Sequence, residues 1–232
     1  ERIKNDIALR TPGNPALYIY KVYSQFDEDG IIAHIFSRIG EGDRVFVEIG
    51  CSDGLENNTH KLLLHGWRGV WIDADADKLR FIAENVPASP RLVIRQAFVS
   101  AGNAGPLVAA ALATLGARTL DLLSVDIDGD DLNVLSDLLR TVQPRVICTE
   151  YNAKFPPPMK LSIIAEPGRL WSGDDYHGAS LTSFVDALHP LGYRLIACGV
   201  SGVNAFFVRD DDAAQFPDYT AEQLFQPARF EL

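Results

Sequence analysis

Short apolar runs alternate with amphipathic segments through the middle of the chain. The runs are rich in Val, Ile and Leu, which is typical of strands buried on both faces of a parallel sheet. Between them, apolar residues recur every three or four positions, the spacing of a helix that buries one face. Because the two patterns alternate, they predict βαβ units and a parallel sheet covered by helices on both faces. The expected strands are residues 44–50, 69–73, 91–98, 120–126 and 145–150, and the expected helices are residues 31–39, 60–65, 77–85, 106–115, 132–139 and 181–188.

Two further apolar runs follow a long insertion at residues 151–178. They occupy residues 193–198 and 204–209, and the connection between them is too short for a parallel crossover, so they must pair as an antiparallel hairpin. Five parallel strands closed by a hairpin resemble the Rossmann-like, seven-strand sheet of the class I S-adenosylmethionine-dependent methyltransferases. We expect a single α/β domain across residues 1–232, with a helical cap segment at 1–40, a core at 41–210 and a C-terminal tail at 211–232.

Composition and charge narrow the class of protein. The chain holds 21 Lys and Arg against 31 Asp and Glu, which gives a formal net charge of −10. A nucleic-acid-binding protein neutralises phosphates with clustered basic residues, and the sequence has no such cluster. No apolar run approaches the roughly 18 residues that a membrane span needs. We therefore expect an enzyme with a small-molecule partner, without nucleic acid and without a membrane span.

Cysteine usage indicates the compartment. Cys51, Cys148 and Cys198 form no CxxC pair and no even disulfide framework. Each lies in or beside an apolar run, where we expect small buried packing residues. A reducing, cytoplasmic location is the natural setting for such a chain.

The loop after the first expected strand carries the first candidate site. It runs from Glu48 through Gly50, Ser52 and Asp53 to Gly54. The glycines let the backbone turn tightly and approach a ligand, and the carboxylates attract a cation. A pyrophosphate would be repelled here, and the G-x-G-x-x-G spacing of a dinucleotide site is missing. The loop therefore favours a cationic methyl donor, a sulfonium with an α-ammonium group, over a purely structural turn.

The ends of the next two strands extend this candidate site. Asp73 ends the second strand, where an acidic side chain can accept hydrogen bonds from an adenosyl ribose. The alternative is a helix N-cap, and we expect that one of Asp73, Asp75 and Asp77 caps the following helix. After the third strand, Ala97 offers a backbone N–H and Phe98 an aromatic edge to an adenine, although Phe98 also fits a core position.

An acidic cluster follows the fourth expected strand. Asp126 and Asp128 lie at the strand end, where a reacting group would sit. We expect Asp130 and Asp131 to face solvent or to cap the next helix. Several carboxylates so close together repel one another unless a cation, a base or solvent relieves the repulsion.

The fifth strand ends beside this cluster and adds two oxygen-bearing side chains. Asp126, Glu150 and Asn152 together form a set that suits a Mg²⁺ ion, which prefers oxygen ligands. A carboxyl pair that shares a proton, or a solvated acidic cleft, explains the same residues equally well. Farther along, His177 lies in a polar loop and is either a general base or a surface histidine.

These residues occur in an order that resembles the FkbM-type methyltransferases. The first half of the chain shares with this family the motifs Glu48-Ile-Gly50, Asp53-Gly54, Asn57-Asn58-Thr59, Gly66-Trp67-Arg68-Gly69 and Asp73. The second half shares the motif Asp126-x-Asp128-Gly129-x-Asp131. Upstream of the first strand, Ser24-Gln25, Asp27 and Asp29 resemble the lead-in found in related sequences. The resemblance implies S-adenosylmethionine as donor and O-methylation of a sugar or natural-product-like small molecule. We also expect Ser52, Asn58, Thr59, Ala74 and Asp126 to take part in binding the donor. The family more often carries Glu at positions 128 and 131, and Asn152 departs from the all-acid metal set of some related enzymes.

The sequence thus predicts an S-adenosylmethionine-dependent O-methyltransferase. We expect Glu48, Gly50, Asp53 and Asp73 to hold the donor. Asp126 would face the reacting centre, and His177 or a bound Mg²⁺ would ease removal of the hydroxyl proton. Two alternatives stay open: a non-catalytic domain of this fold that binds an adenosyl ligand or a partner protein, and an NAD-dependent oxidoreductase on a similar sheet.

Overall fold

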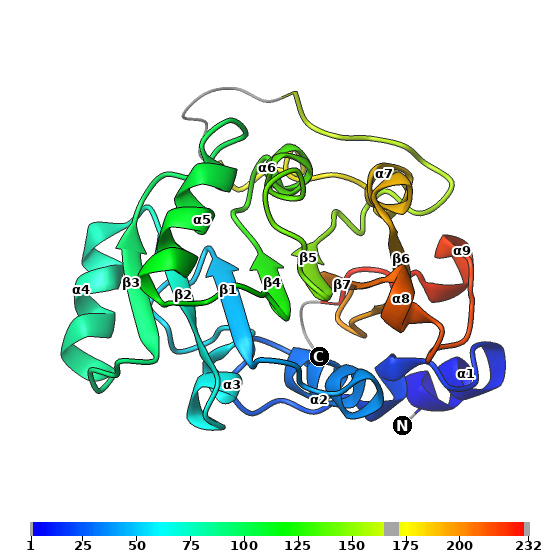
Figure 1. The fold of residues 1–232 in the computed structure, drawn as a ribbon. Helices are drawn as coiled ribbons and strands as arrows, with labels where there is room; N and C mark the ends of the chain where they lie inside the picture. Colours follow the sequence, from blue (N-terminus) through cyan, green and yellow to red (C-terminus); the bar gives the residue numbers. More distant parts are fainter. Residues whose placement is uncertain (1, 165–171, 230–232) are drawn as a thin grey trace.

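A mixed sheet forms the centre of the computed structural model, which describes residues 2–164 and 172–229. Its strands are β1 (Val45–Ile49), β2 (Arg68–Asp73), β3 (Leu92–Gln96), β4 (Leu122–Val125), β5 (Val146–Glu150), β6 (Tyr193–Cys198) and β7 (Asn204–Arg209). The strand order is β3-β2-β1-β4-β5-β7-β6 (Figure 1). The first five strands are parallel, whereas β7 runs antiparallel to both β5 and β6. The predicted seven-strand sheet with a closing hairpin is confirmed.

Helices cover both faces of this sheet. The main ones are α2 (Glu28–Ile39), α3 (His60–Leu64), α4 (Ala76–Asn85), α5 (Ala104–Thr114), α6 (Asp131–Leu138) and α7 (Leu181–Leu188). Val45, Val47 and Ile49 of β1 pack with α5, α6 and α7, while Phe46 packs on the opposite face with α2, α3 and α4. Figure 1 shows α5, α6 and α7 above the sheet and α2 and α3 below it. All six helices were expected from the spacing of apolar residues, with ends that differ from the prediction by at most three residues.

The two ends of the chain carry short helices that the apolar pattern did not predict. They are α1 (Arg2–Arg10) and the 3₁₀ helix η1 (Pro15–Tyr18) near the N-terminus, and α8 (Asp210–Ala213) and α9 (Ala221–Leu224) near the C-terminus. Ile7 of α1 is buried against Ala16 and Val200, so the N-terminal segment packs on the turn of the β6–β7 hairpin. Among the described residues, no helix combines the length and the apolar character that crossing a membrane requires.

The carboxyl ends of the parallel strands meet at one edge of the sheet. The strand order reverses between β1 and β4, which continue to β2 on one side and β5 on the other. In an open α/β sheet this reversal leaves a crevice outside the strand ends, where ligands bind. The chemistry of the protein is therefore to be sought around Gly50, Asp73, Asp126 and Glu150, which stand at or next to those ends.

Candidate functional site

The backbone leaving β1 touches the backbone leaving β4. Gly50 has a φ of +85°, and a Cβ added there would lie 1.6 Å from the carbonyl oxygen of Asp126. The N–H of Asp126 in turn donates to the Ile49 carbonyl at 3.0 Å. Only glycine satisfies both the left-handed conformation and the close approach. Gly50 is thus required because the backbones that leave β1 and β4 pack directly against each other.

Asp73 ties the end of β2 to this loop. Its Oδ2 accepts a hydrogen bond from the Ser52 N–H at 2.7 Å, and its Oδ1 accepts from the Asp75 N–H at 2.9 Å. Asp75 caps α4, because its side chain accepts from the N–H groups of Asp77 and Lys78. The structure therefore brings Asp73 and the glycine loop together, and it assigns the expected capping role to Asp75. Asp73 is partly exposed at the strand tip.

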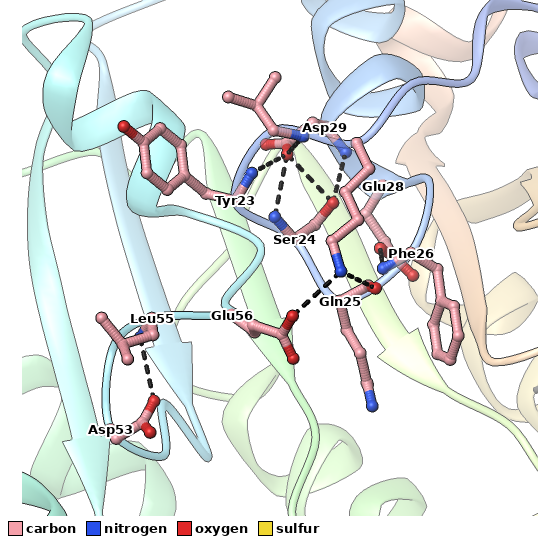
Figure 2. Close-up of polar contacts among 11 residues, drawn as sticks. Tyr23, Ser24, Gln25, Phe26, Glu28, Asp29, Asp53, Leu55 and Glu56 are labelled. Atoms are coloured by element: carbon pink, nitrogen blue, oxygen red, sulfur yellow. Dashed lines mark hydrogen bonds and ion pairs between the residues drawn. The ribbon is translucent and has the colours of Figure 1, made fainter.

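Other residues of the expected donor site line the outer part of the loop and the neighbouring strand ends. Asp53 is partly exposed, and its Oδ1 accepts from the Leu55 N–H at 3.0 Å (Figure 2). Ala74 is exposed next to Asp73. The Ala97 N–H donates to the Asp73 carbonyl at 2.9 Å, so it is not free for an adenine as expected. Phe98 is 44% exposed, which excludes the core alternative for this ring.

Both carboxylate oxygens of Glu48 accept hydrogen bonds from the protein, whereas the sequence led us to expect that they contact the donor. Its side chain is buried; Oε1 accepts from the Asn58 N–H at 2.8 Å, and Oε2 accepts from the Thr59 N–H at 3.2 Å and from the Thr59 hydroxyl. Trp71 donates its indole N–H to the same hydroxyl at 2.8 Å, and Asn58 donates its amide to Ser124. Burial raises the pKa of Glu48 to about 7. Glu48, Asn58 and Thr59 thus fix the loop from behind.

An N-terminal strap, residues 20–29, packs against this loop, and its acids form contacts that sequence reasoning did not identify. Asp29 accepts hydrogen bonds through Oδ2 from the N–H groups of Val22, Tyr23 and Ser24 (Figure 2). Lys21 pairs with Glu56 at 3.0 Å across the same interface. The similar lead-in motif was a signal for this segment, but spacing alone does not say what it contacts.

Two neighbouring acids connect the strap to the far side of the sheet. Asp27 accepts through Oδ2 from the Val200 N–H at 2.6 Å. Glu28 is fully buried and accepts from the Asn204 amide at 2.9 Å. Burial, followed by the neighbouring Glu28, raises the pKa of Asp27 to about 6. The strap is therefore held by buried carboxylates on the β6–β7 hairpin.

The raised pKa of Asp27 gives a pH-dependent stability. The unfolded chain loses this proton near pH 4 and the folded chain near pH 6, so the folded state binds more protons between these values. The free energy of unfolding should fall by about 2 kcal/mol from this group as pH rises from 4 to 6, and level off near pH 7. Urea unfolding of wild type and Asp27→Asn across pH 4 to 8 isolates the effect, since other groups titrate alike in both. Parallel curves for the two proteins would refute it.

The ends of β4 and β5 bring three carboxylates together. Each of Asp126, Asp128 and Glu150 offers an oxygen, and these oxygens lie within 4.8 Å of one another. Burial raises the pKa of Asp126 well above its usual range, and the charges of Asp131 and Asp128 add to the rise. Burial also raises the pKa of Glu150 well above its usual range, with Asp126 as the next cause. This acidic cluster is defined below as Asp126, Asp128 and Glu150.

His177 lies at the edge of the acidic cluster. Its Nδ1 is 3.8 Å from Oε2 of Glu150, and both side chains are largely buried. Burial lowers the pKa of the imidazole from its usual value. His177 is thus half-buried at the end of an exposed loop, and Glu150 lies close both to it and to Asp126, the other residue expected to be catalytic.

Two expectations about this region need correction. Asn152 donates its amide to the carbonyls of Asp175 and His177, and its Oδ1 accepts from the Lys154 N–H at 3.2 Å, so it holds the loop of His177 instead of facing Asp126. Asp131 is fully buried, not solvent-facing, and it accepts from the N–H groups of Ile127 and Gly129. Both side chains shape the loops around the cluster, because unpaired backbone N–H and C=O groups are costly to bury.

Comparison with solved structures agrees with this fold. The N-terminal domain of EvdMO1 with S-adenosylhomocysteine bound is similar at a TM-score of 0.51 and 15% identity, over 89% of this chain and 94% of that chain. An S-adenosylmethionine-dependent methyltransferase from Mesorhizobium loti is similar at a TM-score of 0.46 and 15% identity, over 76% of this chain and 96% of that one. No family model matches the sequence, and no curated protein matches it. At these identities the likeness establishes the class I methyltransferase fold.

Proposed function

We propose that this protein is an S-adenosylmethionine-dependent methyltransferase. The observation that carries the proposal is the junction of Asp73 with the glycine loop: a carboxylate at the tip of β2 holds the Ser52 N–H beside Gly50, at the point where the strand order reverses. This crevice is bordered by carboxylates, which attract a sulfonium and an ammonium group and repel a pyrophosphate. S-Adenosylhomocysteine in the similar EvdMO1 domain supports the choice of ligand.

The donor-binding roles divide between direct contact and support. Asp73, Asp53, Ala74 and Phe98 would contact the adenosyl and methionyl parts of the donor, because they are accessible around the crevice. Glu48, Asn58 and Thr59 would act as positioning residues that hold the loop in shape. Gly50 would let the loop approach the ligand, and the Ala97 N–H would keep β2 and β3 in register.

The chemistry of the strand ends fits transfer to an acceptor hydroxyl. Asp126 would orient the hydroxyl, and His177 would accept its proton while the oxygen takes the methyl group from the sulfonium. The C–S bond breaks as the C–O bond forms, and neutral S-adenosylhomocysteine leaves. Glu150, 3.8 Å from His177, would stabilise the resulting imidazolium.

The acceptor follows from the sequence resemblance and is the least direct part of the proposal. FkbM-type methyltransferases act on sugars and natural-product-like small molecules, and we propose such an acceptor here. Of the expected Mg²⁺ set, Asp126 and Glu150 lie close together, while the Asn152 amide nitrogen donates to the loop of His177. The steps above are assigned to protein side chains.

Isothermal titration calorimetry with S-adenosylhomocysteine tests the donor site. Wild type should bind one molecule per chain, and Asp73→Ala should weaken binding by about tenfold or more, because a charge-assisted hydrogen bond is lost. Asp77→Ala is the matched control: it removes the same charge from the exposed first turn of α4, where Asp77 pairs with Arg80. Its affinity should stay within about twofold of wild type.

Three other outcomes of these experiments would each contradict part of the proposal. Absence of binding to the folded wild type would reject the donor site. Equal losses in Asp73→Ala and Asp77→Ala would show that overall charge, not the strand tip, governs affinity. Binding without methyl transfer to any sugar or polyketide hydroxyl, followed with radiolabelled donor, would favour the non-catalytic alternative.

A further inference from the structure

The N-terminal strap is anchored to the first turn of α2. Oδ2 of Asp29 accepts hydrogen bonds from three consecutive backbone N–H groups, those of residues 22–24, at 2.7 to 2.9 Å (Figure 2). A Cβ added at Gly30 would lie 2.2 Å from the Tyr18 carbonyl oxygen, so the chain that leads into the strap packs directly on the helix. Hydrogen bonds to a carboxylate are strong, and the shared acceptor therefore fixes the backbone of Tyr23.

Tyr23 connects the anchored strap to the first residue of α3. Its ring extends from the strap (Figure 2) and stacks on the imidazole of His60, with the ring centroids 4.5 Å apart and an angle of 20° between the planes. Trp71 of β2 contacts the same imidazole edge to face, at a centroid distance of 5.6 Å. Two aromatic neighbours therefore fix the orientation of the His60 ring.

His60 in turn holds the backbone of the loop after β1. Its Nδ1 lies 2.7 Å from the Gly54 carbonyl oxygen, and because a carbonyl only accepts, the imidazole donates this hydrogen bond. The Gly54 N–H donates to the Cys51 carbonyl at 3.0 Å, which closes a turn. The turn includes Ser52, whose N–H donates to the Asp73 carboxylate. The orientation of the Gly54 peptide thus constrains the part of the loop that borders the proposed donor.

We propose that the strap is a clamp on the donor loop, residues 50–59, and that Tyr23 and His60 are the positioning residues through which it acts. The ion pair of Lys21 with Glu56 joins the same two segments but is exposed, so it contributes little. A loop that is ordered before the donor arrives costs no binding free energy to order, so the clamp increases donor affinity. This effect on affinity rests on the function proposed above; the effect on the loop does not.

Hydrogen–deuterium exchange of the full chain without ligand measures the effect on the loop. The N–H groups of Gly54, Asn58 and Thr59 are hydrogen-bonded, so they exchange only when the loop opens. In Tyr23→Ala the donor loop should exchange about fivefold faster or more, because the ring stacked on the imidazole is lost. Tyr23→Phe keeps that ring and should exchange like wild type. His60→Phe keeps a ring for Tyr23 but removes the N–H that holds Gly54, so it should exchange like Tyr23→Ala.

Tyr18→Ala is the matched control. Tyr18 stacks on His34 of α2 with the ring centroids 3.6 Å apart, so this variant loses a tyrosine–histidine stack of the same kind. Among the described residues, neither ring of this pair stacks on or hydrogen-bonds to the donor loop. Exchange of the donor loop should therefore stay within about twofold of wild type.

Calorimetry with S-adenosylhomocysteine on the same preparations completes the test. Tyr23→Ala and His60→Phe should bind about fivefold more weakly or worse, whereas Tyr23→Phe and Tyr18→Ala should stay within about twofold of wild type. Equal loop exchange in Tyr23→Ala and Tyr18→Ala would overturn the clamp, and so would faster exchange in Tyr23→Ala with unchanged affinity. If Tyr23→Ala exchanges faster but wild type binds no S-adenosylhomocysteine, the proposed function is rejected and the clamp on the loop is supported.

Discussion

Gly50→Ala is expected to destabilise the protein by more than about 3 kcal/mol and to abolish binding of S-adenosylhomocysteine. The new Cβ would lie 1.6 Å from the Asp126 carbonyl oxygen, so the backbones after β1 and β4 must separate. The φ of +85° adds the cost of a left-handed conformation for alanine. Urea unfolding measures the first effect, and calorimetry on the folded fraction measures the second.

Gly66→Ala is the control that distinguishes the steric clash at Gly50 from the cost of a left-handed backbone conformation. Gly66 has a φ of +89°, almost the same as Gly50, but no atom lies within 4 Å of an added Cβ. Its substitution should cost about 1 kcal/mol and leave ligand binding intact. If the two variants lose the same stability, the close approach of the strand ends does not constrain the site.

Glu48→Gln is expected to cost about 3 kcal/mol at pH 5, below the pKa of about 7 that burial gives this carboxyl. The carboxyl oxygens accept from two backbone N–H groups and the Thr59 hydroxyl, whereas an amide keeps a single acceptor oxygen and turns an NH₂ group toward donors. The start of α3 then loses its anchor. The cost should shrink as pH rises from 5 to 8, because ionisation of the buried carboxyl destabilises wild type and Gln does not ionise. Chemical unfolding at pH 5 and at pH 8 measures both differences.

Glu56→Gln provides the control on the same loop. The Glu56 side chain is 60% exposed and pairs with Lys21 at 3.0 Å. Exposed ion pairs contribute little, so this variant should stay within about 0.5 kcal/mol of wild type. A Glu48→Gln protein as stable as Glu56→Gln would mean that Glu48 does not anchor the loop.

The fold could be predicted from the sequence because buried strands and half-buried helices place apolar residues at different, recognisable spacings. The runs that became β1, β2 and β5 are apolar on both faces, as central parallel strands must be, and the short link before residue 204 required a hairpin. The apolar pattern did not predict helix α1, because its four apolar residues among nine form no sustained helical stripe and Ile7 alone is buried. Its position depends on tertiary contacts with Ala16 and Val200.

The sequence located the candidate residues at the strand ends but did not give the directions of their side chains. Asp73 and Asp126 stand at or next to the ends of β2 and β4, and His177 lies 3.8 Å from Glu150 at the end of β5. Residues at the strand ends converge in any parallel sheet. Side-chain direction is set by backbone N–H groups that lack a partner, and these are invisible in sequence. Thus Glu48 and Asp131 turned inward to accept such hydrogen bonds, and Asn152 turned toward its loop.

The most direct test of the central claim compares two adenine-containing ligands on wild-type protein. We claim that the acidic rim at Asp73 and Asp126 selects an adenosyl ligand with an α-ammonium group and rejects a pyrophosphate. Calorimetric titration should show one S-adenosylhomocysteine bound per chain and no heat from NADH at the same concentration. Binding of NADH with none of S-adenosylhomocysteine would contradict the account and restore the oxidoreductase alternative.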